Sequence, residues 1–253
     1  MHEYHRKSFT PEQEELLRAS AGPSVYIPNF LTEKEFELCR QIVMQPIEWP
    51  EHGKVAKYWG FGWETPNGQL LEWLKPKINK IIPNWQLDFL AVQEAITPWK
   101  LHADIRWYAD KIPYKVILMP MDVEPNSGPV DVDQWPDTHT FTFHQRNFLS
   151  KWPDDFKNDK FVGNDQSGWV RPVDNPTYEG LVPGYHITKE QWEQYFTHFP
   201  YSDLEGLTLE QSHKWVPGSL FHWDNTAVHC ADNFLGADIR TKRCLMMFTT
   251  LKS

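Results

Sequence analysis

The sequence predicts a mainly β domain, a β-sandwich or jelly roll with helices packed on one side. Helix signals dominate the first third of the chain, whereas from Asp88 onward short β-rich runs alternate with Pro, Gly, Asn and Asp. Helices followed by a series of strands are typical of sheets that are covered by helices on one face. With 253 residues, 40% of them hydrophobic, the chain can bury one large core, so we expect a single domain over 1–253.

The N-terminal region, about residues 10–82, carries most of the expected helices. Thr10 and Thr32 are each followed three positions later by Gln or Glu, which is the signature of a capped helix start. Residues 24–30, between these two helices, favour a short strand.

A third helix is expected over residues 70–82, with Leu70 facing inward and a kink at Pro76. Residues from about 148 to 215 are rich in Trp, Asp, Pro and Gly, and we interpret them as an insertion between strands. The insertion is either a lid or binding wall, or a loop packed around aromatic anchors. The expected strands are the β-rich runs at 88–95, 114–123, 138–145, 218–223 and 243–251.

The composition argues against two classes of protein. A formal net charge of -9 at pH 7 disfavours a protein that binds nucleic acid mainly through its phosphates. The first residues lack the apolar segment of a signal peptide, and no run of apolar residues is long enough to span a membrane. We therefore expect a soluble, cytoplasmic protein whose three cysteines stay reduced.

Two short segments could supply the ligands of one metal ion. If the first is extended, His102 and Asp104 project to the same side, and His229 offers a second imidazole much later in the chain. The spacing alone proves little, because about 1.5 pairs of His and an acid two positions later are expected by chance. A second such pair exists, His222 with Asp224, but Asp224 lies where the chain favours a turn.

Two histidines and one carboxylate form the ligand set of non-haem Fe(II) oxygenases, which leaves coordination positions open. Zinc with a bound water uses the same residue types, so the ligands alone leave the metal undecided. A cation placed to bind an organic-acid cosubstrate would distinguish an iron oxygenase from a zinc site. Arg243 begins the last strand run and could clamp a carboxylate through two hydrogen bonds; Arg240 is its rival, and a surface role is the alternative for both.

At these residues the sequence resembles the Fe(II)/2-oxoglutarate-dependent dioxygenases, in particular their prolyl-hydroxylase-like or phytanoyl-CoA-hydroxylase-like branch. The similar parts are VYIPNFLTEKEFELCRQIV at 25–43, the pair His102 and Asp104, and GSLFHWDNTAVHCADN at 218–233. The resemblance covers about two thirds of the chain, and the second half of the middle part of the sequence has no similar counterpart in the family.

The resemblance implies a double-stranded β-helix, the cupin-like form of the jelly roll, with Fe(II) held by His102, Asp104 and His229. It also implies 2-oxoglutarate as cosubstrate, O2 as oxidant, ascorbate as an additional candidate, and an unidentified small-molecule or peptide substrate that is hydroxylated. The distal carboxylate of 2-oxoglutarate would meet one of the two arginines named above. Gln93 takes the place of a polar residue that binds the cosubstrate.

Two departures from the family pattern keep alternatives open. The spacing from His229 to Arg243 is longer than usual, which keeps Arg240 as a candidate, and SGPVDVDQW at 127–135 replaces a glycine-rich strand. One alternative function is a non-catalytic jelly-roll module that binds a ligand through its aromatic side chains. Another is a zinc or manganese cupin-type enzyme that does not use 2-oxoglutarate. The sequence predicts neither the substrate nor the oligomeric state.

Overall fold

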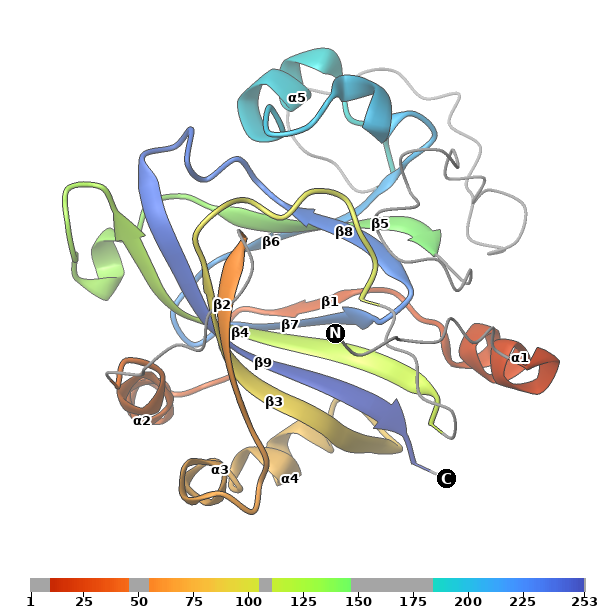
Figure 1. Cartoon of the computed structure of the whole chain (residues 1–253), viewed down its shortest axis with the longest axis vertical. Helices are drawn as coiled ribbons and strands as arrows, with labels where there is room; N and C mark the ends of the chain where they lie inside the picture. Colours follow the sequence, from red (N-terminus) through yellow and green to blue (C-terminus); the bar gives the residue numbers. More distant parts are fainter. Residues whose placement is uncertain (1–9, 46–54, 105–110, 147–183, 253) are drawn as a thin grey trace, which may run out of the picture.

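Two antiparallel β-sheets facing each other form the body of the protein (Figure 1). The computed structural model describes residues 10–45, 55–104, 111–146 and 184–252. The larger sheet has six strands in the order β1-β7-β4-β9-β3-β2, and the smaller has three in the order β6-β5-β8. The strands are β1 Val25–Ile27, β2 Ala56–Phe61, β3 Trp85–Ala95, β4 Pro113–Pro125, β5 His139–Arg146, β6 Leu209–Lys214, β7 Leu220–Asp224, β8 Ala227–Ala231 and β9 Ile239–Leu251. The predicted mainly β class is confirmed.

Helices cover the outer face of the larger sheet (Figure 1). The N-terminal helices α1 and α2 begin where predicted, because Thr10 and Thr32 each close a capping box with the residue three positions later. The bounds are α1 Pro11–Ser20, α2 Glu33–Val43, α3 Pro66–Leu70 and α4 Leu74–Ile78. One buried cluster joins α2 and α4 to the sheet and includes Phe36, Cys39, Ile42, Leu74, Ile78, Val92, Ile117 and Met247.

The third predicted helix is wrong in its extent. Instead of one helix over 70–82, the chain forms two short helices, α3 and α4, with a turn between them. Pro76 lies in the first turn of α4, where its missing N–H needs no helical partner, so it causes no kink. Of the positions expected to face inward, Leu74 and Ile78 are buried, but Leu70 at the end of α3 is 52% exposed and Leu71 is buried in its place.

The space between the two sheets holds a second buried cluster. Side chains alternate along each strand, so every second residue of the larger sheet faces the smaller one. The strands β4 and β9 contribute Val116, Leu118, Cys244, Met246 and Phe248 to this interior. The cluster determines which side chains can reach a site between the sheets.

The predicted insertion overlaps the smaller sheet. Residues 147–183 lie outside the described part of the chain, so the first half of the prediction concerns residues that are not described. The part that follows includes α5, Lys189–Tyr195, whose neighbour Phe196 packs on Phe141 of β5 with the ring centroids 4.7 Å apart. The expected end at 215 is wrong, because Leu209–Lys214 is strand β6, paired with β5. Its sequence, LEQSHK, has no β-branched residue to signal a strand.

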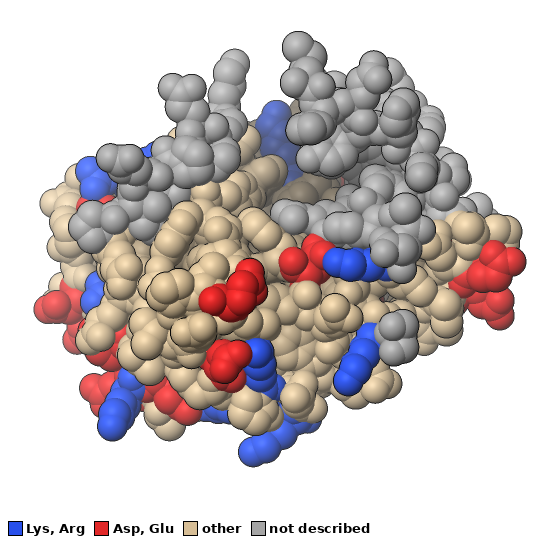
Figure 2. All heavy atoms as spheres, turned by 60° about the horizontal axis from the view of Figure 1, so that its bottom comes forward, with Lys and Arg blue, Asp and Glu red and all other residues tan. Residues whose placement is uncertain are grey.

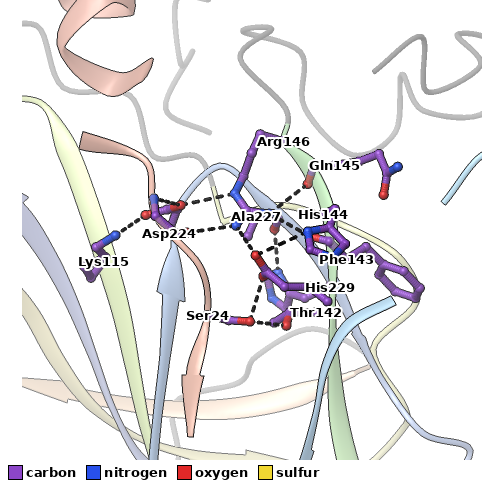
Figure 3. Close-up of polar contacts among 12 residues, drawn as sticks. Ser24, Lys115, Thr142, Phe143, His144, Gln145, Arg146, Asp224, Ala227 and His229 are labelled. Carbon is purple, nitrogen blue, oxygen red and sulfur yellow. Dashed lines mark hydrogen bonds and ion pairs between the residues drawn. The ribbon is translucent and has the colours of Figure 1, made fainter. Parts of the chain in front are cut away.

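A buried group of charged side chains joins the two sheets (Figure 3). Arg146, at the end of β5, donates to Asp224 Oδ2 at 3.1 Å and to Glu210 Oε1 at 2.8 Å, and so connects β5 with β7 and β6. Asp224 also pairs with Lys115 of β4. All four side chains are almost completely excluded from solvent. Two cations therefore face two anions inside the protein, and each depends on the others for its charge balance.

The surface in Figure 2 carries charges of both signs. On this face Lys and Arg are interspersed with Asp and Glu, and the described residues form no continuous basic patch there. A search of the described helices finds none with the length and apolar character that crossing a bilayer requires.

Replacing Arg146 by alanine is expected to lower the free energy of unfolding by about 3–5 kcal/mol, because Asp224 and Glu210 would be left buried without their shared cation. Urea unfolding followed by circular dichroism measures the change. Arg18→Ala is the control: Arg18 pairs with Glu14 on the surface of α1, and its loss should cost about 0.5 kcal/mol or less. If the two variants lose the same free energy of unfolding, the buried ionic group stabilises the fold no more than a surface ion pair does.

Candidate metal centre

The backbone pairs the two histidines directly. His102 N–H donates to the carbonyl of His229 at 3.0 Å, and His229 N–H donates back to the carbonyl of His102 at 2.9 Å. This antiparallel bridge pairs His102 with His229 of β8 and places both side chains on the same side of β8. The two imidazole rings consequently face each other, with their centroids 4.1 Å apart.

Asp104 completes a cluster with the two histidines. The carboxylate oxygen Oδ2 lies 3.2 Å from His229 Nε2, and Oδ1 lies 3.7 Å from His102 Nε2. One potential ligand atom from each of the three residues lies within 4.8 Å of the others, so one ion can contact all three. The structure thus brings together the three residues that the sequence singled out as metal ligands.

Hydrogen bonds fix the orientation of both imidazole rings. His102 Nδ1 lies 2.7 Å from the carbonyl oxygen of Lys100, and His229 Nδ1 lies 2.9 Å from that of Ala227. Because a carbonyl can only accept, each Nδ1 carries a hydrogen, and each Nε2 lies on the side of the Asp104 carboxylate. Burial lowers the pKa of His102 to about 4, helped by the neighbouring His229 and opposed by Asp104. His102 is therefore neutral near pH 7, as a metal ligand must be.

The other His-x-Asp pair is not part of this cluster. Asp224 ends β7 and belongs to the buried ionic group with Lys115 and Arg146. His222 lies on β7 between Val25 of β1 and Ile117 of β4, and burial lowers its pKa to about 4. The pair thus has the structural role that its sequence context predicted.

A cavity of about 260 Å³ opens beside the three residues. Its walls are mainly aromatic and apolar, and include Tyr58, Trp99, Trp215, Trp223, Phe234 and Phe248. Few of the described lining residues are polar. They include His102, Asp104 and His229, together with Tyr58, Gln93, Thr140 and Lys242. A small ligand in this cavity would meet one metal ion, one ammonium group and a water-excluding wall.

The two predicted arginines lie elsewhere. Arg243 donates to Glu94 Oε2 at 2.5 Å, and Arg240, whose side chain is 56% exposed, pairs with Glu124. In the register of β3 and β9, Glu94 is opposite Arg243, and these residues alternate with those that line the cavity. Neither arginine lines the cavity: Arg243 lies on the face of β9 opposite Lys242, whereas Arg240 shares the parity of Lys242 but lies at the start of the strand, where it pairs with Glu124.

Among the described residues that line the cavity, the cation is Lys242. It is 2% exposed, and its Nζ donates to Thr138 Oγ1 at 3.0 Å and to the carbonyl of His139 at 3.2 Å. Its ammonium group also lies over the ring of Trp215, 4.2 Å from the centroid. Burial lowers the pKa of Lys242, and Asp232, 3.4 Å away, opposes this shift and favours the charged form. Its place on the same face as Cys244 and Met246 is the signal that the sequence analysis overlooked.

Gln93 lines the cavity, as the sequence analysis expected, and it has a neighbour that was not predicted. Gln93 Nε2 donates to Tyr58 Oη at 2.5 Å, and the Cys244 thiol donates to Gln93 Oε1 at 3.4 Å. Tyr58 lies on β2, opposite Gln93 in the register. The sequence analysis missed Tyr58 because AKYWGF was not recognised as a strand.

No protein-family model and no curated protein matches this sequence. Solved structures do match it. SnoN, a non-haem α-ketoglutarate-dependent epimerase from nogalamycin biosynthesis, is similar with a TM-score of 0.50 at 15% identity, over 95% of this chain and 84% of SnoN. HygX from Streptomyces hygroscopicus, with nickel and 2-oxoglutarate bound, has a TM-score of 0.48 at 13% identity, over 97% and 88% of the two chains. A Trichoplax adhaerens prolyl hydroxylase in complex with a hypoxia-inducible-factor peptide has a TM-score of 0.47 at 9% identity, over 98% and 96%.

The chain shares the fold of SnoN. At 15% identity the likeness concerns the fold, and with it the predicted jelly roll is confirmed over almost the whole described chain. The residues of the site rest on the geometry of this chain itself. Two imidazoles and one carboxylate converge beside an open cavity, which fits a metal ion with three protein ligands and free positions on the cavity side.

Asp104→Ala is expected to weaken Co(II) or Fe(II) binding by more than about 100-fold, since even a change to an outer-sphere partner costs 10–100-fold. Anaerobic calorimetric titration measures the affinity. The matched control is His222→Asn, which removes the histidine of the second His-x-Asp pair and should leave metal affinity unchanged. If Asp104→Ala binds metal as the unaltered protein does, Asp104 is not a ligand.

Proposed function

We propose that this protein is a non-haem iron oxygenase that couples oxidative decarboxylation of 2-oxoglutarate to hydroxylation of a small molecule or peptide. The observation that supports the proposal is the joint presence of the three-residue cluster and the buried ammonium group of Lys242 in one cavity. SnoN, whose fold the chain shares, is an α-ketoglutarate-dependent enzyme. The cosubstrate cation favours this function over a zinc or manganese enzyme that takes no keto acid.

Each residue has a defined part in this proposal. His102, Asp104 and His229 hold Fe(II), which supplies the oxygen-activating chemistry when 2-oxoglutarate and O2 are bound. Lys242 binds the distal carboxylate of 2-oxoglutarate, in place of the predicted Arg243 or Arg240. The polar pair Gln93 and Tyr58 lies on the cavity wall and orients the bound acid.

The aromatic wall strengthens the interaction of Lys242 with a carboxylate. Trp215 and Phe234 flank its ammonium group at 4.2 and 5.3 Å from their ring centroids and keep water away from it. In such a low-dielectric setting the attraction between ammonium and carboxylate is stronger than at the surface. The cavity volume of about 260 Å³ suits a keto acid beside the reacting part of a small molecule or an extended peptide, rather than a folded macromolecule.

The function is tested by adding Fe(II) and then 2-oxoglutarate to the protein without oxygen. We expect a weak visible charge-transfer band when the keto acid chelates the iron. Admitting air, with ascorbate present to keep iron reduced, should then produce succinate. A protein that binds metal but gives neither the band nor succinate would instead be a cupin-type enzyme of another chemistry, and one that binds no metal would be a ligand-binding module.

Lys242→Met is expected to weaken 2-oxoglutarate binding by about 10–100-fold, the effect of losing one charge-assisted hydrogen bond in a buried site. The dissociation constant is measured by titrating the charge-transfer band. Metal affinity should stay unchanged, since Lys242 belongs to no ligand's hydrogen-bond network.

Arg240→Met is the control for the lysine variant, because Arg240 is a largely exposed cation near the start of the same strand. It should bind 2-oxoglutarate with unchanged affinity. Lys242→Arg, which keeps the charge, should retain more affinity than Lys242→Met. A loss in Arg240→Met with none in Lys242→Met would return the role to the arginine.

A further inference from the structure

The side chain of Asn225 connects the turn between β7 and β8 to a metal ligand. Asn225 is 2% exposed and follows Asp224, the last residue of β7. Its amide fits the surroundings with the nitrogen 2.8 Å from the carbonyl oxygen of Asp104 and the oxygen 3.2 Å from the backbone N–H of Tyr114. The opposite orientation would set oxygen against oxygen and nitrogen against N–H. The backbone N–H of Asn225 also donates to the carbonyl of Tyr114 at 2.9 Å.

The turn that carries Asn225 is fixed from several sides. Asp224 accepts hydrogen bonds from Gly22 N–H at 3.0 Å and from Arg146 Nε at 3.1 Å, besides its ion pair with Lys115 (Figure 3). On the other side of the turn, the carbonyl of Ala227 accepts the hydrogen bond that orients the ring of His229. One rigid turn thus adjoins both the distal histidine and, through Asn225, the carboxylate ligand.

The hydrogen bond from Asn225 reaches Asp104 just beyond the end of the strand pairing. The backbone bridge to β8 involves His102, two residues earlier, and Asp104 itself belongs to no strand. Its carboxylate must nevertheless stay within bonding range of an ion shared with His102 and His229. A hydrogen bond to the backbone carbonyl of Asp104 fixes the position of the backbone that carries this carboxylate. A displacement of about 1 Å is enough to impair a site of this kind.

We propose that Asn225 is a positioning residue that holds Asp104 in place for metal binding, so that the ionic group around Asp224 supports the metal centre through this turn. The proposal rests on the metal site of the proposed function. The role requires a side chain as long as asparagine that can donate one hydrogen bond to Asp104 and accept another from Tyr114. Aspartate keeps the acceptor for Tyr114 but sets a negative oxygen against the Asp104 carbonyl, and alanine loses both bonds.

The test compares Asn225→Asp with Gln145→Glu. Gln145 is an equally buried amide that clamps two backbone groups, donating to the carbonyl of Gly206 at 2.9 Å and accepting from Thr208 N–H at 3.0 Å. It contacts no metal ligand, so its loss reports the cost of breaking a buried amide clamp alone. Asn225→Ala is made alongside, in case the added charge of aspartate prevents folding.

Two measurements are made on each variant. Co(II) affinity should fall about 10–100-fold in the Asn225 variants, with an altered ligand-field absorption spectrum, and should be unchanged in Gln145→Glu. Hydrogen exchange of the metal-free protein provides a readout that needs no metal. The amides of His102 and His229 should exchange about 5- to 10-fold faster in the Asn225 variants, as expected for the loss of one hydrogen bond nearby, and at the original rate in Gln145→Glu.

The outcomes separate this proposal from the proposed function. If the unaltered protein binds metal but forms no succinate, and the Asn225 variants selectively lose metal affinity and exchange faster near His102, the positioning role stands and the oxygenase fails; if it binds no metal, both proposals are overturned. If metal binds and supports succinate formation, but the Asn225 variants match Gln145→Glu in affinity, spectrum and exchange, the positioning role is overturned. Equal loss of thermal stability in all variants, without a difference at the metal site, would likewise overturn it.

Discussion

The buried ionic group of Arg146, Asp224, Glu210 and Lys115 is the constraint on which the arrangement of the two sheets depends. Arg146 and Glu210 lie on the smaller sheet, and Asp224 and Lys115 on the larger one, so their contacts fix one sheet against the other. The segment before β1 joins the same group, because Arg146 donates to the carbonyl of Gly22 at 2.9 Å. If one sheet shifted against the other, at least one of these buried charges would lose its partner, which is strongly unfavourable.

Fixing the sheets also fixes the candidate metal centre, since its three residues come from separate parts of the chain. His229 lies on β8 of the smaller sheet, and β8 begins directly after the turn that follows Asp224. Lys242 comes from β9 of the larger sheet and approaches the same cavity from the other side. The distance between the metal cluster and the ammonium group is therefore a distance between sheets, and the length of the acid that fits between them depends on the same packing.

The sequence was sufficient for the fold class and for choosing the three residues that the structure brings together, because these follow from local patterns. The helix starts at Thr10 and Thr32 were signalled by capping residues, and the pair His102 and Asp104 by alternation along an extended segment. The letters alone did not show which cation lines the cavity, because the parity of Arg243 and the place of Arg240 at the start of the strand are known only once the register of β9 is known. The links made by Asn225 and Tyr58 join residues far apart in the chain, and no local pattern announces them.

The reciprocal backbone bridge between His102 and His229 has a consequence for the order of folding. These residues are 127 positions apart, so the bridge closes a very long loop, and the entropy lost in closing it is regained only through the many contacts between the sheets. We therefore expect the two imidazoles to meet only after the sheets have assembled. An ion bound by these residues would then stabilise a scaffold that is already folded and would not be needed to start its folding.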